Sequence, residues 1–360
     1  LCPGVRGVTF GTFHSVFFWM LRNAYNYTAA NIVTDSEKYG VIRDSIDRHG
    51  FRYDSQEDFA KNVVGEIGNV KSGRVSLENY ESTTMKPEDF RVVYDEYENF
   101  LRRCGKIDFD DMLVFTYELL SERPDILKMW QNKFRYILID EFQDINMIQY
   151  DIVKLLAGER QNVFSVGDDD QSVYGFRGAA PAIMKKFPED FHGTVIEYLN
   201  VNYRCSYDIV ECSKRIIQNN RDRYEKQLRS AFAAGQSDRV HIVKTDSTTE
   251  QNKKIIDRIT ELNRAGIPYR EMAIIFRTNT EPRALASKLM ENGIPFLMKD
   301  NIPNIFTHFL AENIFDYIRL ARGNRDRRTV LRIINKPNRY ISRDAFDSPV
   351  VNFEELRQHY

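Results

Sequence analysis

Two short apolar runs, each ending on acidic residues, place the strongest constraint on how this chain folds. The run YILI ends on Asp140 and Glu141, and the run NVFSVG ends on Asp168, which two further aspartates follow. Between the two runs lies a segment whose apolar residues recur at helical spacing. Strands that alternate with helices predict βαβ units and a parallel sheet, so the expected fold class is α/β. Ligands bind beyond the carboxyl ends of such strands, which is where these acids fall.

Other stretches of the chain separate into helical and strand-like patterns. Residues 16–134 have mostly helical spacing, and so has the tail, 301–360. Within the first stretch, Gly105 is expected to end one helix and Asp108 to cap the next. Three further apolar runs are candidates for buried strands: TVIEYL (194–199), RVHIVKT (239–245) and MAIIFRT (272–278).

The composition is that of an ordinary globular protein and gives no sign of nucleic-acid binding. Hydrophobic residues make up 42% of the 360 residues, charged residues 29%, and the formal net charge is −1. Because DNA-binding domains are usually basic, any DNA contact must come from local patches. No apolar run approaches the ~18 residues of a membrane span. The four cysteines have no metal-binding spacing, so we expect a cytoplasmic protein with reduced thiols and no membrane partner.

The acidic pair after the first run has the arrangement of a nucleotide-hydrolysing site. A hydrophobic strand that delivers two adjacent acids to its end is the Walker B arrangement. Asp140 would hold Mg²⁺ on the nucleotide, and Glu141 would orient and deprotonate the attacking water. The alternative is a strand end capped by two solvated acids, and for an isolated pair that alternative is the better interpretation.

A second motif favours the nucleotide site. Residues 167–179 are GDDDQSVYGFRGA. With DEFQD at 140–144, they resemble motifs II and III of the UvrD/PcrA/Rep-type superfamily 1 DNA helicases almost letter for letter. The resemblance implies that Gln171 senses the γ-phosphate and that Phe176 stacks on a DNA base, a contact worth about 1–3 kcal/mol. Many members have Trp in place of Phe176, and a core aromatic is the alternative for it; Arg177 would contact phosphate or link the motif to the acids.

A third motif follows in the segment 199–220, LNVNYRCSYDIVECSKRIIQNN. It resembles motif IV of the same helicases, with Cys205 in place of the usual serine. The resemblance implies that Arg204 reaches the γ-phosphate as an arginine finger, an interaction worth about 10³–10⁵ in rate. It also implies that Tyr203 packs on the adenine. Taken alone, the Tyr-Arg pair would be interpreted as the entry to a helix with a salt bridge.

A shorter motif, GTFHS at 11–15, resembles motif Ib of the family. Thr12 and His14 would contact the phosphates of single-stranded DNA at the start of a helix. The alternative is a capped helix in which Thr12 or Ser15 is the cap and His14 has no special role.

The phosphate-binding loop of the family is not among these residues. The family hydrolyses ATP through the pattern G-x-x-x-x-G-K-S/T, but the one Gly-Lys step here, Gly105-Lys106, is followed by Ile107. Neither a P-loop lysine nor a glycine-rich amide cradle is therefore identified in the sequence. Leu1 at the start and the helix-like segment FEELRQHY at the end lead us to expect a chain cut at both ends.

The resemblance also implies a domain organisation. A partial first RecA-like domain is expected at 1–23 and 107–193, interrupted by a helical insertion at 24–106. Part of a second RecA-like domain follows at 194–300. The start of a second helical insertion is expected at 301–360.

For the intact protein, the resemblance implies ATP-driven 3′-to-5′ movement along single-stranded DNA and unwinding of duplexes. ATP and Mg²⁺ would be the cofactors, single-stranded DNA and duplex junctions the partners, and DNA repair or replication restart the role. We expect this chain alone to be inactive. Two alternatives stay open: a nucleic-acid-binding module without a phosphate loop, and the helicase portion of a helicase–nuclease complex.

Overall fold

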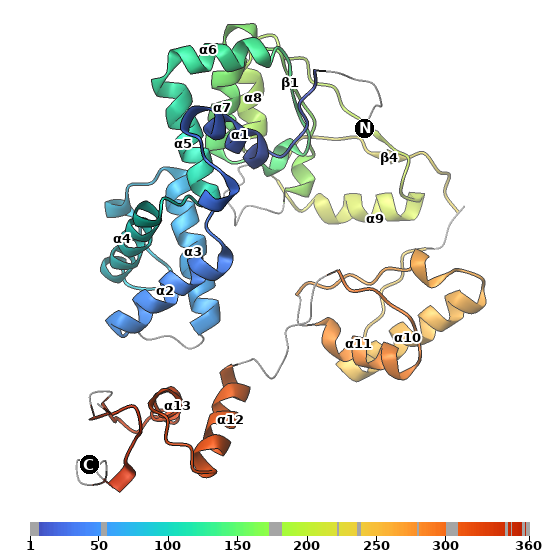
Figure 1. Cartoon of the computed structure of the whole chain (residues 1–360). Coiled ribbons are helices and arrows are strands. Elements are labelled where there is room, and N and C mark those ends of the chain that lie inside the picture. Colours follow the sequence, from blue (N-terminus) through green and yellow to red (C-terminus); the bar gives the residue numbers. More distant parts are fainter. Residues whose placement is uncertain are drawn as a thin grey trace. The chain divides into compact units, whose positions relative to one another are not determined.

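The computed structural model forms two compact units, Leu1–Val240 and His241–Tyr360 (Figure 1). The residues that the structure describes are 7–51, 56–172, 182–221, 223–235, 239–278, 281–299, 309–342, 345–346, 348–354 and 357.

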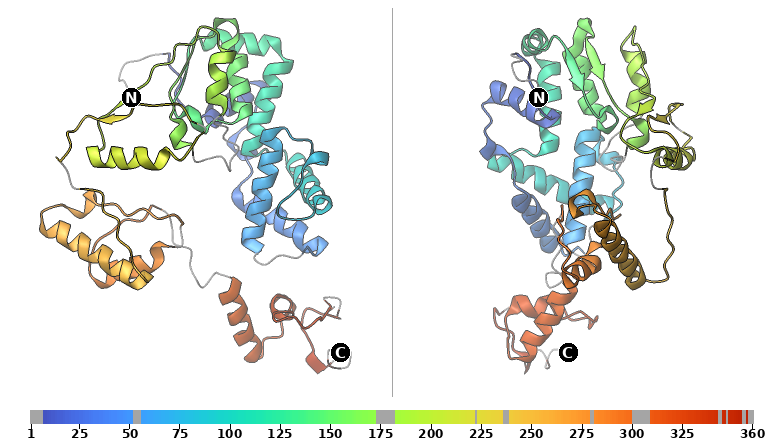
Figure 2. Two further views of the ribbon diagram at one scale, coloured as in Figure 1. Left: turned by 180° about the vertical axis from the view of Figure 1, so that it is seen from behind. Right: turned by 90° about the vertical axis from the view of Figure 1, so that its right-hand side faces the viewer.

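Two parallel strands organise the part of the first unit that carries the acids. Strand β1 (Ile137–Ile139) pairs with β2 (Val163–Ser165), and helix α7 (Met147–Ala157) connects them, so the predicted βαβ unit is confirmed. Helices α7 and α8 (Ala182–Asp190) contribute to one core with β1 (Figure 2). The predicted α/β fold class is therefore confirmed.

The side chains of β1 and β2 alternate between a packed and an exposed face, as strand geometry requires. Ile139 is buried against α7 and α8. The cross-strand pair Leu138 and Phe164 points the other way and is 73% and 62% exposed. Three helices complete this part of the fold and share a second core around Trp130: α1 (Phe13–Tyr25), α5 (Phe109–Glu122) and α6 (Pro124–Lys133).

Three predicted strands are wrong. The runs 194–199, 239–245 and 272–278 belong to no hydrogen-bonded ladder. Many of their apolar side chains are exposed, Leu199, Ile242 and Ile275 by 86%, 90% and 92%, although Met272 and Phe276 pack against the core around Ile259. An apolar run becomes a strand only when another strand receives its backbone groups. The sequence of one run carries no information about that partner, and no segment in the described part of the chain supplies it.

A second parallel pair does form, and it is shorter than any predicted strand. Strand β3 (Val201–Asn202) pairs with β4 (Arg229–Ser230). Helix α9 (Tyr207–Ile217) lies between the two strands in the sequence.

A helical subdomain interrupts the first unit. Helices α2 (Asp35–His49), α3 (Gln56–Gly73) and α4 (Pro87–Cys104) enclose a core of their own, and the described residues that form it all fall within 33–101. Gly105 ends α4 with a φ of 60°, a left-handed conformation that glycine adopts without strain, so the predicted stop is confirmed. The predicted cap is confirmed as well, because Asp108 accepts a hydrogen bond from the backbone N–H of Asp111 at 2.8 Å.

A buried ion cluster joins this subdomain to α5. The ammonium of Lys71 on α3 lies 2.5 Å from Glu98, 2.9 Å from Asp108 and 2.7 Å from Asp111. Burial and the neighbouring charge of Asp108 raise the pKa of Asp110 to about 6. Asp110 therefore binds a proton more tightly in the folded chain than in the unfolded chain.

This shift predicts that the contribution of Asp110 to stability falls as pH rises from about 4 to about 6. Folding favours protonated Asp110 below pH 6, and this contribution is lost once the folded carboxyl ionises. Asp110→Asn is expected to raise the free energy of unfolding at pH 7 by about 1–2 kcal/mol, after discounting for partial exposure, and to change it little at pH 4. Urea unfolding at both pH values measures this. Equal effects of the substitution at both pH values would contradict it.

The second unit holds two small helical clusters. Helices α10 (Thr248–Arg264) and α11 (Pro282–Glu291) share a core that includes Ile259 and Leu285. The helical tail predicted from the sequence is confirmed over α12 (Phe309–Ala321) and α13 (Arg327–Ile333). None of the described helices is long and apolar enough to cross a bilayer. Single-turn 3₁₀ helices occur at Ala29–Asn31, Leu77–Asn79, Phe142–Asp144, Gly158–Arg160, Asp169–Gln171 and Tyr269–Glu271.

Candidate functional site

The two predicted Walker B acids lie directly after β1 and are exposed. Glu141 has φ 52° and ψ 45°, a left-handed conformation that costs a non-glycine residue of order 1 kcal/mol or more. The turn lets its backbone N–H donate to Asp140 Oδ1 at 3.0 Å. Backbone strain of this kind is concentrated at functional sites. The strained turn thus holds Glu141 hydrogen-bonded to Asp140 at the end of β1.

Gln143, a buried residue of the same motif, connects Glu141 to the end of β2. Its Nε2 donates to Glu141 Oε2 at 2.8 Å, and its Oε1 accepts from the backbone N–H of Asp168 at 2.9 Å. The amide side chain of Gln143 therefore joins the two acidic strand ends, in addition to the backbone hydrogen bond from Phe142 N–H to the Val166 carbonyl. The sequence analysis assigned no role to Gln143, although it lies within the DEFQD motif.

The close approach of these strand ends depends on Gly167. A Cβ on this residue would lie 2.9 Å from Gln143 Oε1, 3.2 Å from the Gln143 backbone nitrogen and 3.2 Å from Phe142 Cβ. Any larger residue must displace the buried amide that joins Asp168 to Glu141.

Gly167→Ala is therefore expected to destabilise the chain by about 1–3 kcal/mol, the usual effect of overpacking. The matched control is Gly40→Ala, on a helix where nothing lies within 4 Å of the added Cβ. That control should be neutral or stabilising by about 0.5–1 kcal/mol. Urea unfolding of both variants measures the difference, and equal stabilities would contradict the assigned packing.

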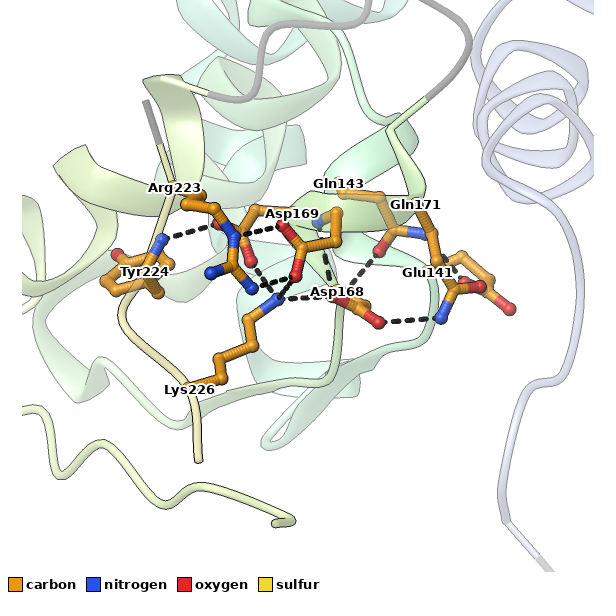
Figure 3. Close-up of polar contacts among 9 residues, drawn as sticks. Glu141, Gln143, Asp168, Asp169, Gln171, Arg223, Tyr224 and Lys226 are labelled. Carbon is orange, nitrogen blue, oxygen red and sulfur yellow. Dashed lines mark hydrogen bonds and ion pairs between the residues drawn. The ribbon is translucent and has the colours of Figure 1, made fainter. Parts of the chain in front are cut away.

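The second predicted motif forms an acidic loop after β2, consisting of Asp168, Asp169 and Asp170. Gln171, the predicted phosphate sensor, is exposed and donates from Nε2 to Asp168 Oδ2 at 2.7 Å. Glu141, Gln143, Asp168 and Gln171 thus belong to one hydrogen-bonded network (Figure 3). Phe176 and Arg177, predicted to contact DNA, lie outside the described residues.

The carboxylates of the acidic loop are close enough to one another to suggest a metal site. The ammonium of Lys226 is instead hydrogen-bonded to Asp168 and Asp170 and paired with Asp169. Arg223 forms a fork with Asp170, at 2.7 Å from Nε and 2.5 Å from Nη2. The protein's own cations therefore occupy the position that a metal ion would take.

These contacts shift the pKa values of the acidic loop. The hydrogen bonds from Arg223 hold the pKa of Asp170 below its ordinary value. Burial alone would raise the pKa of Asp168, but hydrogen bonds from Lys226 and Gln171 lower it overall. Asp168 and Asp170 are consequently ionised at neutral pH. Sequence reasoning missed Arg223 and Lys226, because neither lies in a recognised motif and only their charge marks them.

The predicted nucleotide-contacting pair lies in the turn between β3 and α9. Tyr203 is 77% exposed, and Arg204 is exposed as well. The turn is fixed by Asn202, whose Oδ1 accepts from the backbone N–H groups of Arg204 at 2.9 Å and Cys205 at 2.7 Å. The sequence analysis assigned no role to Asn202 either, although an Asn whose side chain binds the backbone two residues on is a common turn signal.

Thr12 and His14, the predicted DNA contacts near the start of the chain, interact with residues around helix α1. Thr12 caps α1, since its hydroxyl accepts from the Ser15 backbone N–H at 3.2 Å. His14 lies edge-on to Phe109 at 5.5 Å between ring centroids, and burial lowers the pKa of its imidazole. A neutral, half-buried imidazole offers a phosphate a hydrogen bond rather than a charge. Among the described residues, neither side chain belongs to the network that contains Glu141.

Two parallel strands that are joined by a helix and end on acidic residues are consistent with the RecA-like fold of helicases. The family model of the UvrD/REP helicase N-terminal domain matches residues 3–192, and that of the UvrD-like helicase C-terminal domain matches 197–355. The chain therefore belongs to the UvrD/REP helicase family.

Similar proteins agree with this assignment. The chain is 32% identical over 342 residues to the ATP-dependent DNA helicase PcrA of Staphylococcus epidermidis, covering 92% of this chain and 45% of that protein. It is 31% identical over 337 residues to PcrA of Staphylococcus aureus, covering 91% and 45%. The chain thus spans about half the length of the relatives that it matches.

Proposed function

We propose that this chain carries the water-activating and phosphate-sensing residues of an ATP-dependent DNA helicase that moves 3′ to 5′ along single-stranded DNA. The observation that carries the proposal is the network that joins Glu141 to Gln171 through Gln143 and Asp168. It holds a candidate base and a candidate sensor at the same edge of a parallel sheet, where ligands bind. Relatives that are named ATP-dependent DNA helicases support the reaction class.

Each residue of the site has a role in this proposal. Asp140 presents exposed carboxylate oxygens, which are the ligands Mg²⁺ prefers, so the residues present fit a magnesium ion. When bound, that ion neutralises charge on the nucleotide phosphates. Glu141 accepts a proton from the attacking water, Gln171 senses the γ-phosphate, and Arg204 stabilises charge that develops on it. Tyr203 packs against the adenine.

Other residues are proposed to contact DNA. Phe176 stacks on a base, and Arg177, Thr12 and His14 contact the backbone of the single strand. Duplex junctions are the proposed substrate, and DNA repair or replication restart in the cytoplasm is the proposed setting. Because the net charge of the chain is −1, affinity should rest on these few contacts rather than on a broad basic surface.

The phosphate-binding loop is the part that these residues do not provide. No G-x-x-x-x-G-K-S/T pattern occurs among the 360 residues. We therefore propose that this chain alone does not turn over ATP, and that a protein of the relatives' full length containing it does.

The test compares the two proteins. Phosphate release is measured with and without single-stranded DNA, beside a Glu141→Gln control, and unwinding is measured on duplexes with a 3′ or a 5′ tail. We expect the 360-residue chain to match its control, and the full-length protein to hydrolyse ATP in a DNA-stimulated way and to open the 3′-tailed duplex. Turnover by the chain that vanishes in its control would overturn the argument from the missing loop. Unwinding of the 5′-tailed duplex alone would overturn the direction.

A further inference from the structure

The segment that follows α9 makes a docking contact on the acidic loop. Lys226 pairs with Asp168, Asp169 and Asp170 together, at 3.1 Å from Asp170 Oδ2. The side chain of Lys226 is only 19% exposed, and that of Asp169 is 5% exposed. Exposed ion pairs contribute little to structure, but Lys226 and Asp169 are largely shielded from water, whereas Asp168 is 39% exposed. Figure 3 shows Arg223, Tyr224 and Lys226 facing the loop from one side and Gln143 and Gln171 from the other.

Tyr224 makes the contact specific in geometry as well as in charge. Its backbone N–H donates to Asp169 Oδ2 at 2.6 Å, and its hydroxyl donates to the carbonyl of Met184 on α8 at 2.9 Å. A purely electrostatic attraction would leave the segment free to slide along the acids. The backbone and hydroxyl contacts fix its register.

From the acidic loop, hydrogen bonds lead to both proposed catalytic side chains. Asp168 accepts from the Gln171 side chain at 2.7 Å, and its backbone N–H donates to Gln143 at 2.9 Å. Gln143 then donates to Glu141 at 2.8 Å. The ammonium of Lys226 is thus bonded to the residue on which both branches depend.

In the other direction, the same segment leads to the turn that carries Arg204. Three residues after Lys226, strand β4 pairs with β3 through Arg229 and Ser230. The hydroxyl of Ser230 donates to the Cys205 carbonyl at 2.9 Å, and Asn202 holds the backbone of Arg204 at 2.9 Å. A short, hydrogen-bonded stretch of chain therefore separates Lys226 from the proposed arginine finger.

We propose that Lys226 and Arg223 are positioning residues, which set the acidic loop and thereby link the turn that bears Arg204 to Gln171 and Glu141. The inference rests on the proposed function, because it assigns these two cations to the same hydrolytic site. A displacement of the segment would loosen both the Asp168 carboxylate, which accepts from Gln171, and the Asp168 backbone N–H, which donates to Gln143. Spatial connection alone does not establish coupling, so the test must measure coupling itself.

The first test uses the 360-residue chain and needs no nucleotide. The chain is labelled with ¹⁵N-glutamine, and solvent exchange of the side-chain amides of Gln171 and Gln143 is followed by NMR, with signals assigned from Gln→Glu variants. Lys226→Met should accelerate exchange of the Gln171 amide by about tenfold or more, because its acceptor is no longer held in place. Lys226→Arg should keep exchange within about twofold of wild type.

The matched control is Lys214→Met, since Lys214 pairs with Glu211 on α9 at 2.8 Å without touching the loop. It should leave both amides unchanged. If Lys226→Met does not fold, a charge swap between Arg223 and Asp170 tests the inference instead. Arg223→Asp and Asp170→Arg should each accelerate exchange, and the double variant should recover it. Unchanged amide exchange in a folded Lys226→Met, or no recovery in the double variant, would overturn the inference.

An activity test separates this inference from the proposed function. In the full-length protein, Lys226→Met should lower DNA-stimulated kcat by at least about tenfold with the KM for ATP near wild type, and Lys226→Arg should restore it. If Lys226 had a merely structural role, Lys226→Met and Lys226→Arg would both lower the melting temperature. The ratio of ATP turnover with DNA to turnover without DNA would then stay at its wild-type value. Failure of the wild type to hydrolyse ATP would remove the proposed function and leave the NMR result standing. An active wild type with no response to Lys226→Met would remove only the positioning role.

Discussion

Replacing Glu141 with glutamine is expected to slow ATP turnover by about 10²–10⁴-fold in a protein of the relatives' full length, the usual contribution of a general base. Nucleotide binding should stay near wild type. The substitution is nearly isosteric, and the glutamine oxygen can still accept from Gln143 Nε2, which donates to Glu141 at 2.8 Å in the native chain. The left-handed backbone at this residue does not depend on the carboxylate. The variant therefore loses the proton acceptor and keeps the network.

Steady-state phosphate release and titration with a fluorescent ATP analogue measure these two quantities separately. Glu159→Gln is the matched control, because it makes the same change of charge on an exposed residue of the same unit. Turnover near wild type in Glu141→Gln would remove the assignment of the base. An equal loss in Glu159→Gln would show that net charge, and not this carboxylate, governs the rate.

Features that depend on a few neighbouring residues could be predicted from the sequence. The strand ending at Ile139, the stop at Gly105 and the cap at Asp108 each follow from local spacing or from one backbone preference. The same holds for the acids at the two strand ends, because parallel strands necessarily bring their carboxyl ends to one edge.

Features that depend on distant partners could not be predicted. The run MAIIFRT has the composition of a buried strand, yet it remains outside any ladder, with Ile275 exposed by 92%. In the site, Lys226 lies 58 residues beyond its partner Asp168, and no spacing rule connects them. Gln143 could have been singled out from the sequence, because it lies inside a motif. Its role could not, because that role depends on the absence of a Cβ at Gly167. Polar networks across a fold thus need coordinates even where their members are individually recognisable.

Removing the guanidinium of Arg204 is expected to have the largest effect, a loss of about 10³–10⁵ in DNA-stimulated ATP turnover in the full-length protein. Arg204→Ala should preserve the turn, since Asn202 binds the backbone N–H of Arg204 and not its side chain. Arg204→Lys should recover little of the rate, because an ammonium cannot reproduce the planar, two-pronged contact of a guanidinium with phosphate. The melting temperature of both variants should remain close to that of wild type.

The matched control is Arg215→Ala, which removes an exposed arginine from the adjacent helix α9. Turnover should stay near wild type in this variant, and a comparable loss would assign the effect to general surface charge. Combining Arg204→Ala with Glu141→Gln sharpens the result, because residues that act on one chemical step are strongly non-additive. A double variant no slower than the worse single variant would indicate that Arg204 and Glu141 act on the same phosphoryl transfer. Rate losses that multiply would place Arg204 in a separate step and contradict its role as the arginine finger.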